Sequence, residues 1–359
     1  MSLDDDWGRS ALVGTTVAGR YRVVAQRASG GRAELFEAAH VEHGAVVGLA
    51  IVQVPREAAA AADRALAGLP AAPVFRDPHV APLADAGRVD AGSVFFASEL
   101  VRGVALRTHM SGPMIEQRHA LAVMRQVLQA AAAGHEHGIA HRDVKPDNIV
   151  LTKGGDGGDF VKLLDFAPGV MLSAAAAQLG EATLARVWQS AFGDLRYISP
   201  ECVLGKKADG RADIYSAGAV LYELLTGHPP FVADDVAALM RLHAYAPIQP
   251  LHQRAPGRTF TPELEALAAG ALHKTPEQRY RSAFEMMSAI DDALRSLGEA
   301  PPGEEERPKR DSLAALAPRP PEAPLPPPPV VPANVDRLVR PLPWWTRLWR
   351  RLGLGKSQA

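Results

Sequence analysis

The sequence predicts an α+β protein with two unequal lobes, a small antiparallel sheet with one helix followed by a larger helical lobe. Short apolar or alternating runs, separated by Gly and polar turns, dominate the N-terminal part, and such runs are typical of strands. From Ile115 onward, apolar residues recur at offsets of three and four, which is the period of a helix. Strands in one block and helices in the next indicate an α+β arrangement.

Each expected element follows from a local pattern of apolar residues. The expected strands cover residues 21–24, 35–39, 46–54 and 94–100. Residues 56–69 are Ala-rich with Leu66 and Leu69 at helical spacing, which predicts one helix against this sheet. The helical lobe is expected from Leu121, Met124, Val127 and Leu128, followed by further helices at 214–225, 236–242, 264–272 and 283–297.

The composition changes sharply after residue 297. Residues 301–343 contain 14 of the chain's 30 prolines, which predicts an extended polyproline spacer. The expected organisation is therefore an N-terminal extension at 1–18, a two-lobed domain at 19–297 with lobes at 19–102 and 103–297, a Pro-rich linker at 298–335 and a tail at 336–359.

The tail at 336–359 interleaves aromatic and basic residues. On a helical projection Trp344, Trp345 and Trp349 gather with leucines on one side, and arginines gather on the other. This pattern is typical of a helix at a membrane interface. Three interpretations stay open: contact with a membrane surface, binding in the groove of a partner protein, and packing back onto the helical lobe.

Charge and cysteine content restrict the compartment and the partners. The chain has 39 Lys and Arg against 40 Asp and Glu, a net charge of -1, so no nucleic-acid partner is expected. A single cysteine, Cys202, favours a reducing compartment. The acidic N-terminus lacks a secretory signal, and no run of about 18 apolar residues suits a membrane span. We expect a cytoplasmic protein, peripheral at the inner membrane face if the tail binds lipid.

The most specific string is HRDVKPDN, which ends at Asn148 and is followed by LLDF. Asp143 is suited to accept a proton from a hydroxyl group, and Lys145 to neutralise a phosphoryl group in transfer. Asn148 and Asp165 supply hard oxygen ligands of the kind that Mg²⁺ prefers. These two loops therefore predict metal-assisted phosphoryl transfer.

Both loops resemble the catalytic and metal loops of eukaryotic-like (Hanks-type) protein kinases, as found in bacteria, over about 19–297 of this chain. The Lys145-Pro146 pair is typical of the serine/threonine-specific branch. Glu201 and Arg279 resemble a buried pair of the family, and Asp213 resembles the acid that braces the catalytic loop. The resemblance implies the bilobal protein-kinase fold, ATP and Mg²⁺ as cofactors, a protein substrate or regulated partner protein, and a role in signalling.

The glycine loop that covers the phosphates in this family is altered. It reads ASGGRA, so of the family's three glycines only the middle one, Gly30, remains, followed by Gly31. Methyl groups at Ala28 and Ala33 hinder the close backbone approach that glycine permits. The resemblance still implies that Gly30, Gly31 and Leu35 contact the nucleotide.

The lysine with which the family holds the α and β phosphates is missing from the third strand. By resemblance, the segment VGLA places Ala50 at its position, and none of the chain's 8 lysines precedes Lys145. No shift of the alignment therefore restores it. The candidates for a substitute cation are Arg22 and Arg32, and the acids near the predicted helix, which otherwise form a solvated face, are Glu57 and Asp63.

Adenine contacts are expected at the segment FFASELV, which resembles the hinge between the lobes. The resemblance implies that Glu99 and Val101 offer backbone hydrogen bonds to adenine. Ser98 is then a small gatekeeper, and Val150 forms the floor of the pocket.

Two further positions depart from the family in the second lobe. The metal loop reads DFAP, in which Pro168 biases Ala167 toward an extended backbone. Asp194 stands where the family has a threonine that bonds the catalytic aspartate and lysine. Its carboxylate either pairs with Lys145 or repels Asp143, and the sequence leaves both outcomes open.

Two functions fit an intact catalytic loop combined with a degraded grip on the phosphates. A lost charge-assisted contact is worth about 1.5 to 3 kcal/mol, which predicts roughly a 10- to 150-fold penalty. The favoured function is therefore a regulatory pseudokinase that binds Mg-nucleotide and acts through its surface or its tail. The alternative is an active but slow ATP-dependent serine/threonine protein kinase with Asp143 as the base.

Overall fold

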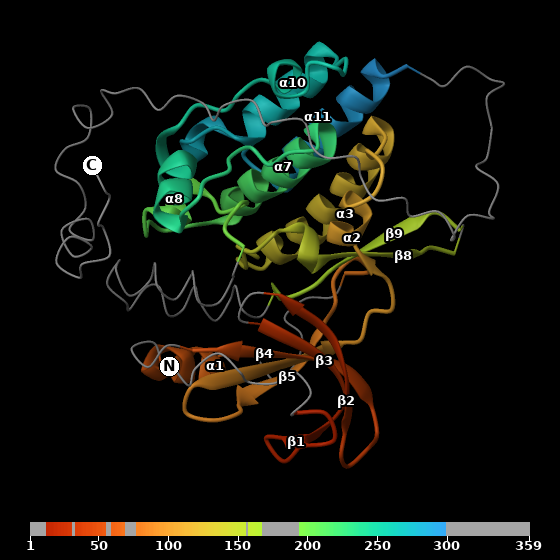
Figure 1. Cartoon of the computed structure of the whole chain (residues 1–359), viewed down its shortest axis with the longest axis vertical. Helices are drawn as coiled ribbons and strands as arrows, with labels where there is room; N and C mark the ends of the chain where they lie inside the picture. The colour runs from red at the N-terminus through yellow and green to blue at the C-terminus, as the bar shows by residue number, and fades with distance from the viewer. Residues whose placement is uncertain are drawn as a thin grey trace.

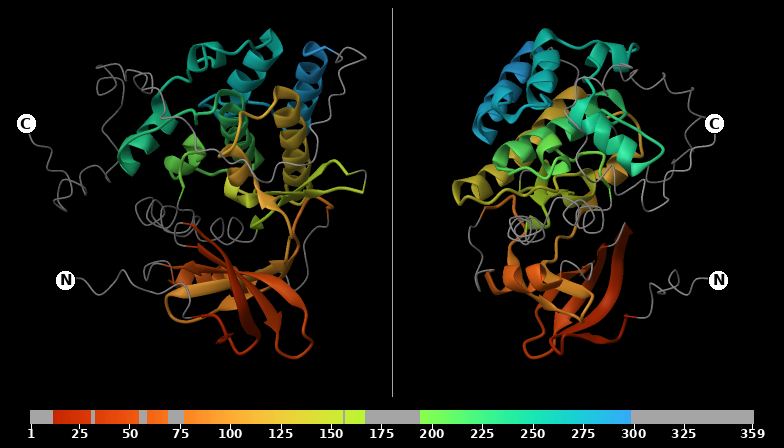
Figure 2. Two further views of the ribbon diagram at one scale, coloured as in Figure 1. Left: turned by 45° about the vertical axis from the view of Figure 1, so that its right-hand side comes forward. Right: turned by 90° about the vertical axis from the view of Figure 1, so that its left-hand side faces the viewer.

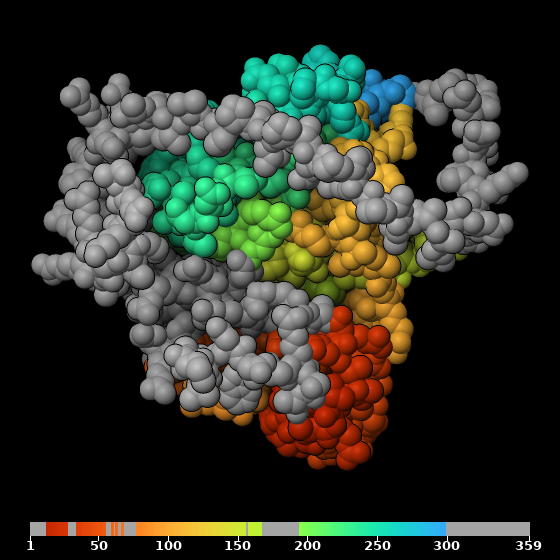
Figure 3. Space-filling model, in the orientation of Figure 1, coloured from red at the N-terminus to blue at the C-terminus, as the bar shows by residue number. Residues whose placement is uncertain are grey.

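The chain folds into two lobes, one small and strand-rich and one larger and helical (Figure 1). This computed structural model describes residues 12–30, 33–54, 59–68, 77–155, 157–166 and 194–298. The lobes remain separate when the molecule is turned about its vertical axis (Figure 2). In the space-filling view the N-terminal lobe, in red, lies below the helical lobe (Figure 3).

A six-stranded antiparallel sheet forms the N-terminal lobe, in the order β1-β2-β3-β4-β6-β5. All four expected strands are present, and β1 and β5 are additional. The two-residue β1 is too short for a periodic signal, and β5, LADAGR, does not alternate. The strands are β1 (Thr16–Val17), β2 (Tyr21–Gly30), β3 (Ala33–His40), β4 (Val46–Gln53), β5 (Leu83–Arg88) and β6 (Ser93–Glu99).

Strand β4 is buried on both of its faces. Its side chains point alternately to one face and the other, and this alternation decides on which face Ala50 lies. Leu49 and Ile51 pack with Phe36 and other residues on one face of the sheet. Ala50 belongs to a second cluster, which also contains Ala62 of α1 (Ala59–Gly68). Because side chains alternate along a strand, Ala50 faces the helix side of the sheet.

A segment of the N-terminal lobe pairs directly with the second lobe. The carbonyl of His79 accepts a hydrogen bond from the amide of Leu163 at 2.7 Å, and the amide of Ala81 donates to the Leu163 carbonyl at 3.0 Å. Leu163 ends β9 (Asp159–Leu163), which pairs with β8 (Ile149–Lys153); β8 in turn pairs with β7 (Val104–Ala105). This contact fixes the strands that carry the metal loop to the N-terminal lobe.

The helical lobe is built around α7 (Gly210–Thr226), which is buried continuously from Ala212 onward. Its packing against α10 requires a glycine, because a Cβ on Gly218 would lie 2.6 Å from the Cβ of Ala271. Each stretch expected to be helical in this lobe is helical to within one residue of its expected end. Among the described residues, three short α-helices, α2, α6 and α9, and two 3₁₀ helices, η2 and η3, are additional. The remaining helices are α2 (Leu106–Met110), α3 (Gln117–Glu136), η2 (Pro146–Asn148), α6 (Pro200–Val203), α8 (Val236–Tyr245), α9 (Leu251–Arg254), α10 (Pro262–Ala271), η3 (Pro276–Gln278) and α11 (Ala283–Ser296).

A buried ion pair ties α6 to the loop before α11. The Arg279 guanidinium donates two hydrogen bonds of 2.7 Å to the Glu201 carboxylate, and the two side chains are 0% and 4% exposed. Arg279 also donates to the backbone carbonyls of Arg211 and His273. The expected pairing of Glu201 with Arg279 is therefore confirmed, with the guanidinium fully used, as a buried charge requires.

A buried histidine connects α8 to α7. The Nδ1 atom of His243 lies 3.0 Å from the Tyr215 hydroxyl, and its ring packs edge-on against Phe231. Lys274 donates to the His243 carbonyl at 2.9 Å. Burial, reinforced by the nearby charge of Lys274, lowers the pKa of His243 to about 3. The imidazole is therefore neutral in the folded chain across the physiological pH range.

Stability is expected to fall as the pH falls through the unfolded pKa of histidine. Below pH 6.5 the unfolded chain binds a proton that folded His243 does not bind, so acid favours unfolding. Between pH 7 and 5 this residue alone accounts for about 2 kcal/mol of lost unfolding free energy. Urea unfolding at both pH values measures it. The His243→Gln variant should lose about that much less than wild type, whereas the exposed His109→Gln should match wild type. Equal losses in wild type and His243→Gln would contradict the assignment.

Candidate functional site

A single buried carboxylate braces the loop that carries the candidate catalytic residues. Asp213, which is 0% exposed, accepts hydrogen bonds from the backbone amides of His141 at 2.8 Å and Arg142 at 2.6 Å. Its Oδ2 atom also lies 2.7 Å from Nε2 of His135. Burial alone would raise the pKa of Asp213, but the hydrogen bond and charge of His135 outweigh it and lower the pKa. The bracing role that the resemblance implied for Asp213 fits these contacts.

The ring of His141 joins the catalytic loop to the metal loop. Its Nδ1 atom accepts a hydrogen bond from the Asp143 amide at 3.2 Å, so Nε2 is the atom that donates to the Leu164 carbonyl at 2.6 Å. Burial lowers the pKa of His141, which keeps this neutral tautomer. The Leu164 amide donates in turn to the Asn148 carbonyl at 2.9 Å. The residue before Asp165 is thus held at both of its backbone polar groups.

Three of the predicted site residues meet at the carboxylate of Asp143. Lys145 Nζ donates to Asp143 Oδ2 at 2.7 Å, and Asn148 Nδ2 donates to the same oxygen and to the Asp143 carbonyl, both at 2.9 Å. The side chains of Asp143 and Lys145 are each 12% exposed. Burial raises the pKa of Asp143 to about 7, although Lys145 and Asn148 oppose the rise. A carboxylate with such a pKa is suited to proton transfer near neutral pH.

The two predicted metal ligands lie on adjoining loops and present suitable donors. Because Nδ2 of Asn148 is committed to Asp143, its Oδ1 atom is the one left for a cation. Asp165 has a left-handed backbone, with φ of 64°, and none of the described residues donates a hydrogen bond to its carboxylate. Burial raises the pKa of Asp165, and the charge of Lys145 only partly compensates. Two hard oxygen donors of this kind fit Mg²⁺.

A small apolar side chain occupies position 50, where the resemblance leads us to expect a lysine. Ala50 is 6% exposed and lies in register with Leu35 on β3 and Phe96 on β6. Asp63 of α1 accepts a hydrogen bond from Arg88 at 2.6 Å, so it is paired within the sheet-and-helix lobe. Arg22, one candidate for a substitute cation, is exposed on β2. Ala50 is therefore packed among apolar side chains, and Arg22 is not buried with it.

Predicted nucleotide contacts come from both lobes. Gly30 ends β2 and Leu35 lies on β3 in the N-terminal lobe, whereas Val150 is buried on β8, opposite Ala105. Val101 lies between β6 and β7, in the segment that joins the lobes. The predicted nucleotide contacts therefore lie in both lobes and in the segment that joins the two lobes.

The backbone amide of Glu99 already donates a hydrogen bond within the protein. Its amide donates to the Pro82 carbonyl at 3.1 Å, and its side chain pairs with Lys162 of β9 at 2.8 Å. The ion pair joins the end of β6 to the second lobe, a link that the sequence analysis missed.

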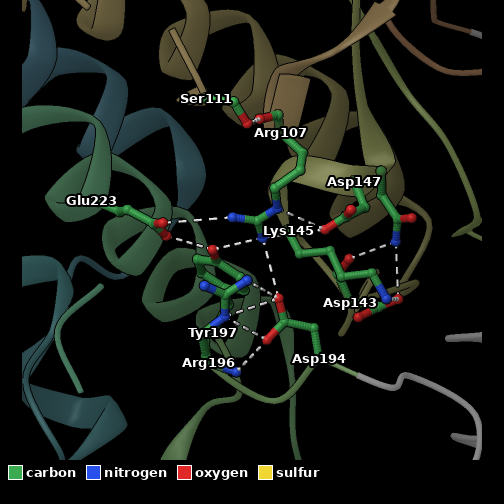
Figure 4. Close-up of polar contacts among 10 residues, drawn as sticks. Arg107, Ser111, Asp143, Lys145, Asp147, Asp194, Arg196, Tyr197 and Glu223 are labelled. Atoms are coloured by element: carbon green, nitrogen blue, oxygen red, sulfur yellow. Dashed lines mark hydrogen bonds and ion pairs between the residues drawn. The ribbon is translucent and has the colours of Figure 1, made fainter. Parts of the chain in front are cut away.

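Asp194 takes neither of the two roles that were left open for it. Its Oδ2 atom accepts a hydrogen bond from Arg107 at 3.1 Å and another from Arg196 at 2.7 Å (Figure 4). Burial alone would raise the pKa of Asp194, but the hydrogen bonds and charge of Arg196 outweigh it and lower the pKa. The carboxylate is therefore ionised and neutralised locally. Its partner Arg107 was missed because nothing in the short helix α2 marks it.

Several predictions concern residues outside the described part of the chain. These are Gly31, Arg32 and Glu57 in the N-terminal lobe, the Ala167-Pro168 departure in the metal loop, and the tail at 336–359 with the linker before it. Within the described part, no helix is long and apolar enough to cross a membrane.

Comparison with known proteins agrees with this fold. The model of the protein kinase domain family matches residues 21–290. The serine/threonine-protein kinase PknD of Mycobacterium tuberculosis is 34% identical over 280 residues, which cover 77% of this chain and 40% of PknD. The serine/threonine-protein kinase pkn3 of Myxococcus xanthus is 32% identical over 319 residues, which cover 86% of this chain and 56% of that protein. The chain therefore matches only about half of these relatives' length.

A solved structure shares the architecture. The crystal structure of the M. tuberculosis PknI kinase domain superposes with a TM-score of 0.58 at 24% identity, covering 78% of this chain and 97% of that one. At this identity the likeness concerns the fold alone. The family match spans most of the chain and includes the braced catalytic loop, so the chain belongs to the protein kinase domain family.

Proposed function

We propose that this chain is a serine/threonine-kinase-like signalling protein that binds MgATP but transfers phosphate poorly, as a regulatory pseudokinase. The observation that carries the proposal is an ordered catalytic loop next to a phosphate site whose lysine position is held by Ala50. Asp143, Lys145 and Asn148 form one hydrogen-bonded group, whereas Ala50 is buried against apolar neighbours. The part of the site on the helical lobe keeps the expected polar residues, whereas the part on the sheet of the N-terminal lobe lacks its cation.

Nucleotide binding is supported by residues of the helical lobe and of the segment that joins the two lobes. Asn148 and Asp165 would hold Mg²⁺, which supplies positive charge to the phosphates. Lys145, whose charge is reinforced by Asp143 at 2.7 Å, offers a further cation near the transferred phosphoryl group. Glu99 and Val101 would bind adenine through their backbones, between Leu35 above and Val150 below.

Impaired transfer is supported by the environment of Ala50. A charge-assisted hydrogen bond contributes about 1.5 to 3 kcal/mol, so its absence slows a reaction that depends on positioning by roughly 10- to 150-fold. The loop at 28–33 adds to this effect because it has lost two of the family's three glycines. Such a protein acts mainly through contacts with a partner protein, and the tail at 336–359 would supply contact with a partner or a membrane surface.

A second candidate function is a slow but active serine/threonine protein kinase. One observation favours it: burial raises the pKa of Asp143 to about 7, a value suited to a general base at neutral pH. Lys145 would then stabilise the charge on the transferring phosphoryl group. The relatives named above are serine/threonine-protein kinases, and their activity fits this alternative.

A phosphotransfer assay separates the two functions. Purified chain is incubated with radiolabelled MgATP and a mixed protein substrate, in parallel with Asp143→Asn and a matched variant, Asp291→Asn, on the outer helix α11. The proposal predicts that wild type and Asp143→Asn incorporate equal, background amounts of label, because the missing cation and the altered loop at 28–33 together bring transfer through Asp143 below the background of the assay. Incorporation that disappears in Asp143→Asn and persists in Asp291→Asn would establish the active kinase instead.

Nucleotide binding is tested separately by thermal unfolding. MgATP at saturation should raise the Tm by about 2 to 6 °C, because a ligand stabilises the state that binds it. ATP with EDTA should give a smaller shift, and Asp165→Asn should remove the difference between the two conditions. If wild type shows no shift with MgATP, or if its shift is independent of magnesium, the proposed metal-nucleotide site is wrong.

A further inference from the structure

Three carboxylates converge on one guanidinium beside the catalytic loop. Arg107 Nη2 lies 3.2 Å from Asp147 and 3.1 Å from Asp194, and Nη1 lies 3.5 Å from Glu223. Figure 4 shows Arg107 between Glu223 on one side and Asp147 on the other. Asp147 belongs to η2, directly after the loop that carries Lys145. This group of charges therefore borders the surface where a polypeptide would meet Asp143.

Asp147 and Glu223 take their guanidinium contacts from Arg107. Arg196 provides a second guanidinium, but its hydrogen bonds go to Asp194. Arg107 also donates to the Tyr197 hydroxyl at 2.8 Å, and that hydroxyl donates to Glu223. With the Arg107 side chain 25% exposed, these interactions are partly shielded from water and are stronger than those of a fully exposed pair.

A cavity of about 330 Å³ opens next to the guanidinium. Arg107 and Glu223 form its polar wall, and Met110, Met114 and Leu224 contribute apolar walls. A volume of this size admits a single long side chain from a bound peptide. Its walls suit an aliphatic chain, and its polar wall carries the charge that decides which end group is accepted.

We propose that Arg107 is a specificity-determining residue for polypeptide binding: it occupies the carboxylates beside the catalytic loop and makes this cavity accept an apolar side chain and reject a basic one. The inference rests on the part of the proposed function in which a protein lies across the catalytic loop. It does not depend on phosphoryl transfer.

The selectivity follows from the charges that an incoming side chain would meet. A peptide arginine entering the cavity would approach Arg107 and would find its nearest acid, Glu223, already bonded to Arg107 and Tyr197. A leucine or methionine would instead contact Met110, Met114 and Leu224 without disturbing an ion pair. Removal of Arg107 leaves three acids facing one remaining guanidinium and widens the cavity, so a peptide arginine could then take the vacated place.

The test compares peptide binding by the full-length chain and its Arg107→Ala variant. Two sets of fluorescent peptides with a central serine differ only in carrying arginine or leucine at one flanking position at a time. Fluorescence anisotropy should show that wild type binds no arginine peptide more tightly than its leucine counterpart. At about 50 mM salt, Arg107→Ala should prefer arginine at one or more positions by about tenfold, and less at about 300 mM salt.

Matched variants separate the effect from a general loss of structure. Arg125→Ala removes an exposed ion pair with Asp291 on the outer helices and should keep the wild-type preference. Adding Glu223→Gln to Arg107→Ala should weaken the acquired preference for arginine. Arg107→Met, which keeps most of the aliphatic volume, replaces Arg107→Ala if the latter unfolds, with the same expectation.

The proposal is overturned if wild type prefers arginine peptides, if the Arg107 variants acquire no preference, or if no variant binds either set. These outcomes are independent of the phosphotransfer assay. A chain that transfers no phosphate but shows the predicted change in peptide preference supports the inference.

Discussion

The buried carboxylate of Asp213 is the constraint on which the rest of the site depends. It accepts the amide hydrogens of His141 and Arg142, and Arg142 is held there with a left-handed φ of 66°. A non-glycine residue in this conformation costs about 1 to 3 kcal/mol and persists only when its surroundings enforce it. The turn at Arg142 directs Asp143 toward Lys145 and Asn148. Without the buried acceptor, the loop would lose the geometry that makes it a candidate catalytic loop.

The residues that Asp213 fixes and the residue at position 50 lie in different surroundings. Asp143, Lys145 and Asn148 form a hydrogen-bonded group on a loop that α7 fixes through Asp213. Ala50 lies instead on β4, in an apolar cluster that also contains Phe96. The sheet therefore packs without a charge at this position.

The sequence predicted the fold, and it placed Asp143, Lys145, Asn148 and Asp165 on two adjoining loops, because both predictions depend on local patterns. The long helices have clear periods, and HRDVKPDN is specific in order and spacing. The outcome at Asp194 was not predictable, since its partner Arg107 lies 87 residues away on a five-residue helix. The ion pair between Glu99 and Lys162 was not predictable either, because it joins strands of different lobes. Contacts between distant charged side chains leave no periodic signal.

The proposal that a missing cation at position 50 weakens phosphate binding is tested most directly by placing a lysine there. Isothermal titration calorimetry compares MgATP binding by Ala50→Lys with Ala50→Met, a variant of similar length without charge. We expect Ala50→Lys to bind MgATP about tenfold or more tightly than Ala50→Met, because a charge-assisted contact contributes about 1.5 to 3 kcal/mol. Equal affinities in two folded variants would show that a cation at this position does not limit the binding of the phosphates, and the proposed cause of impaired transfer would then be wrong.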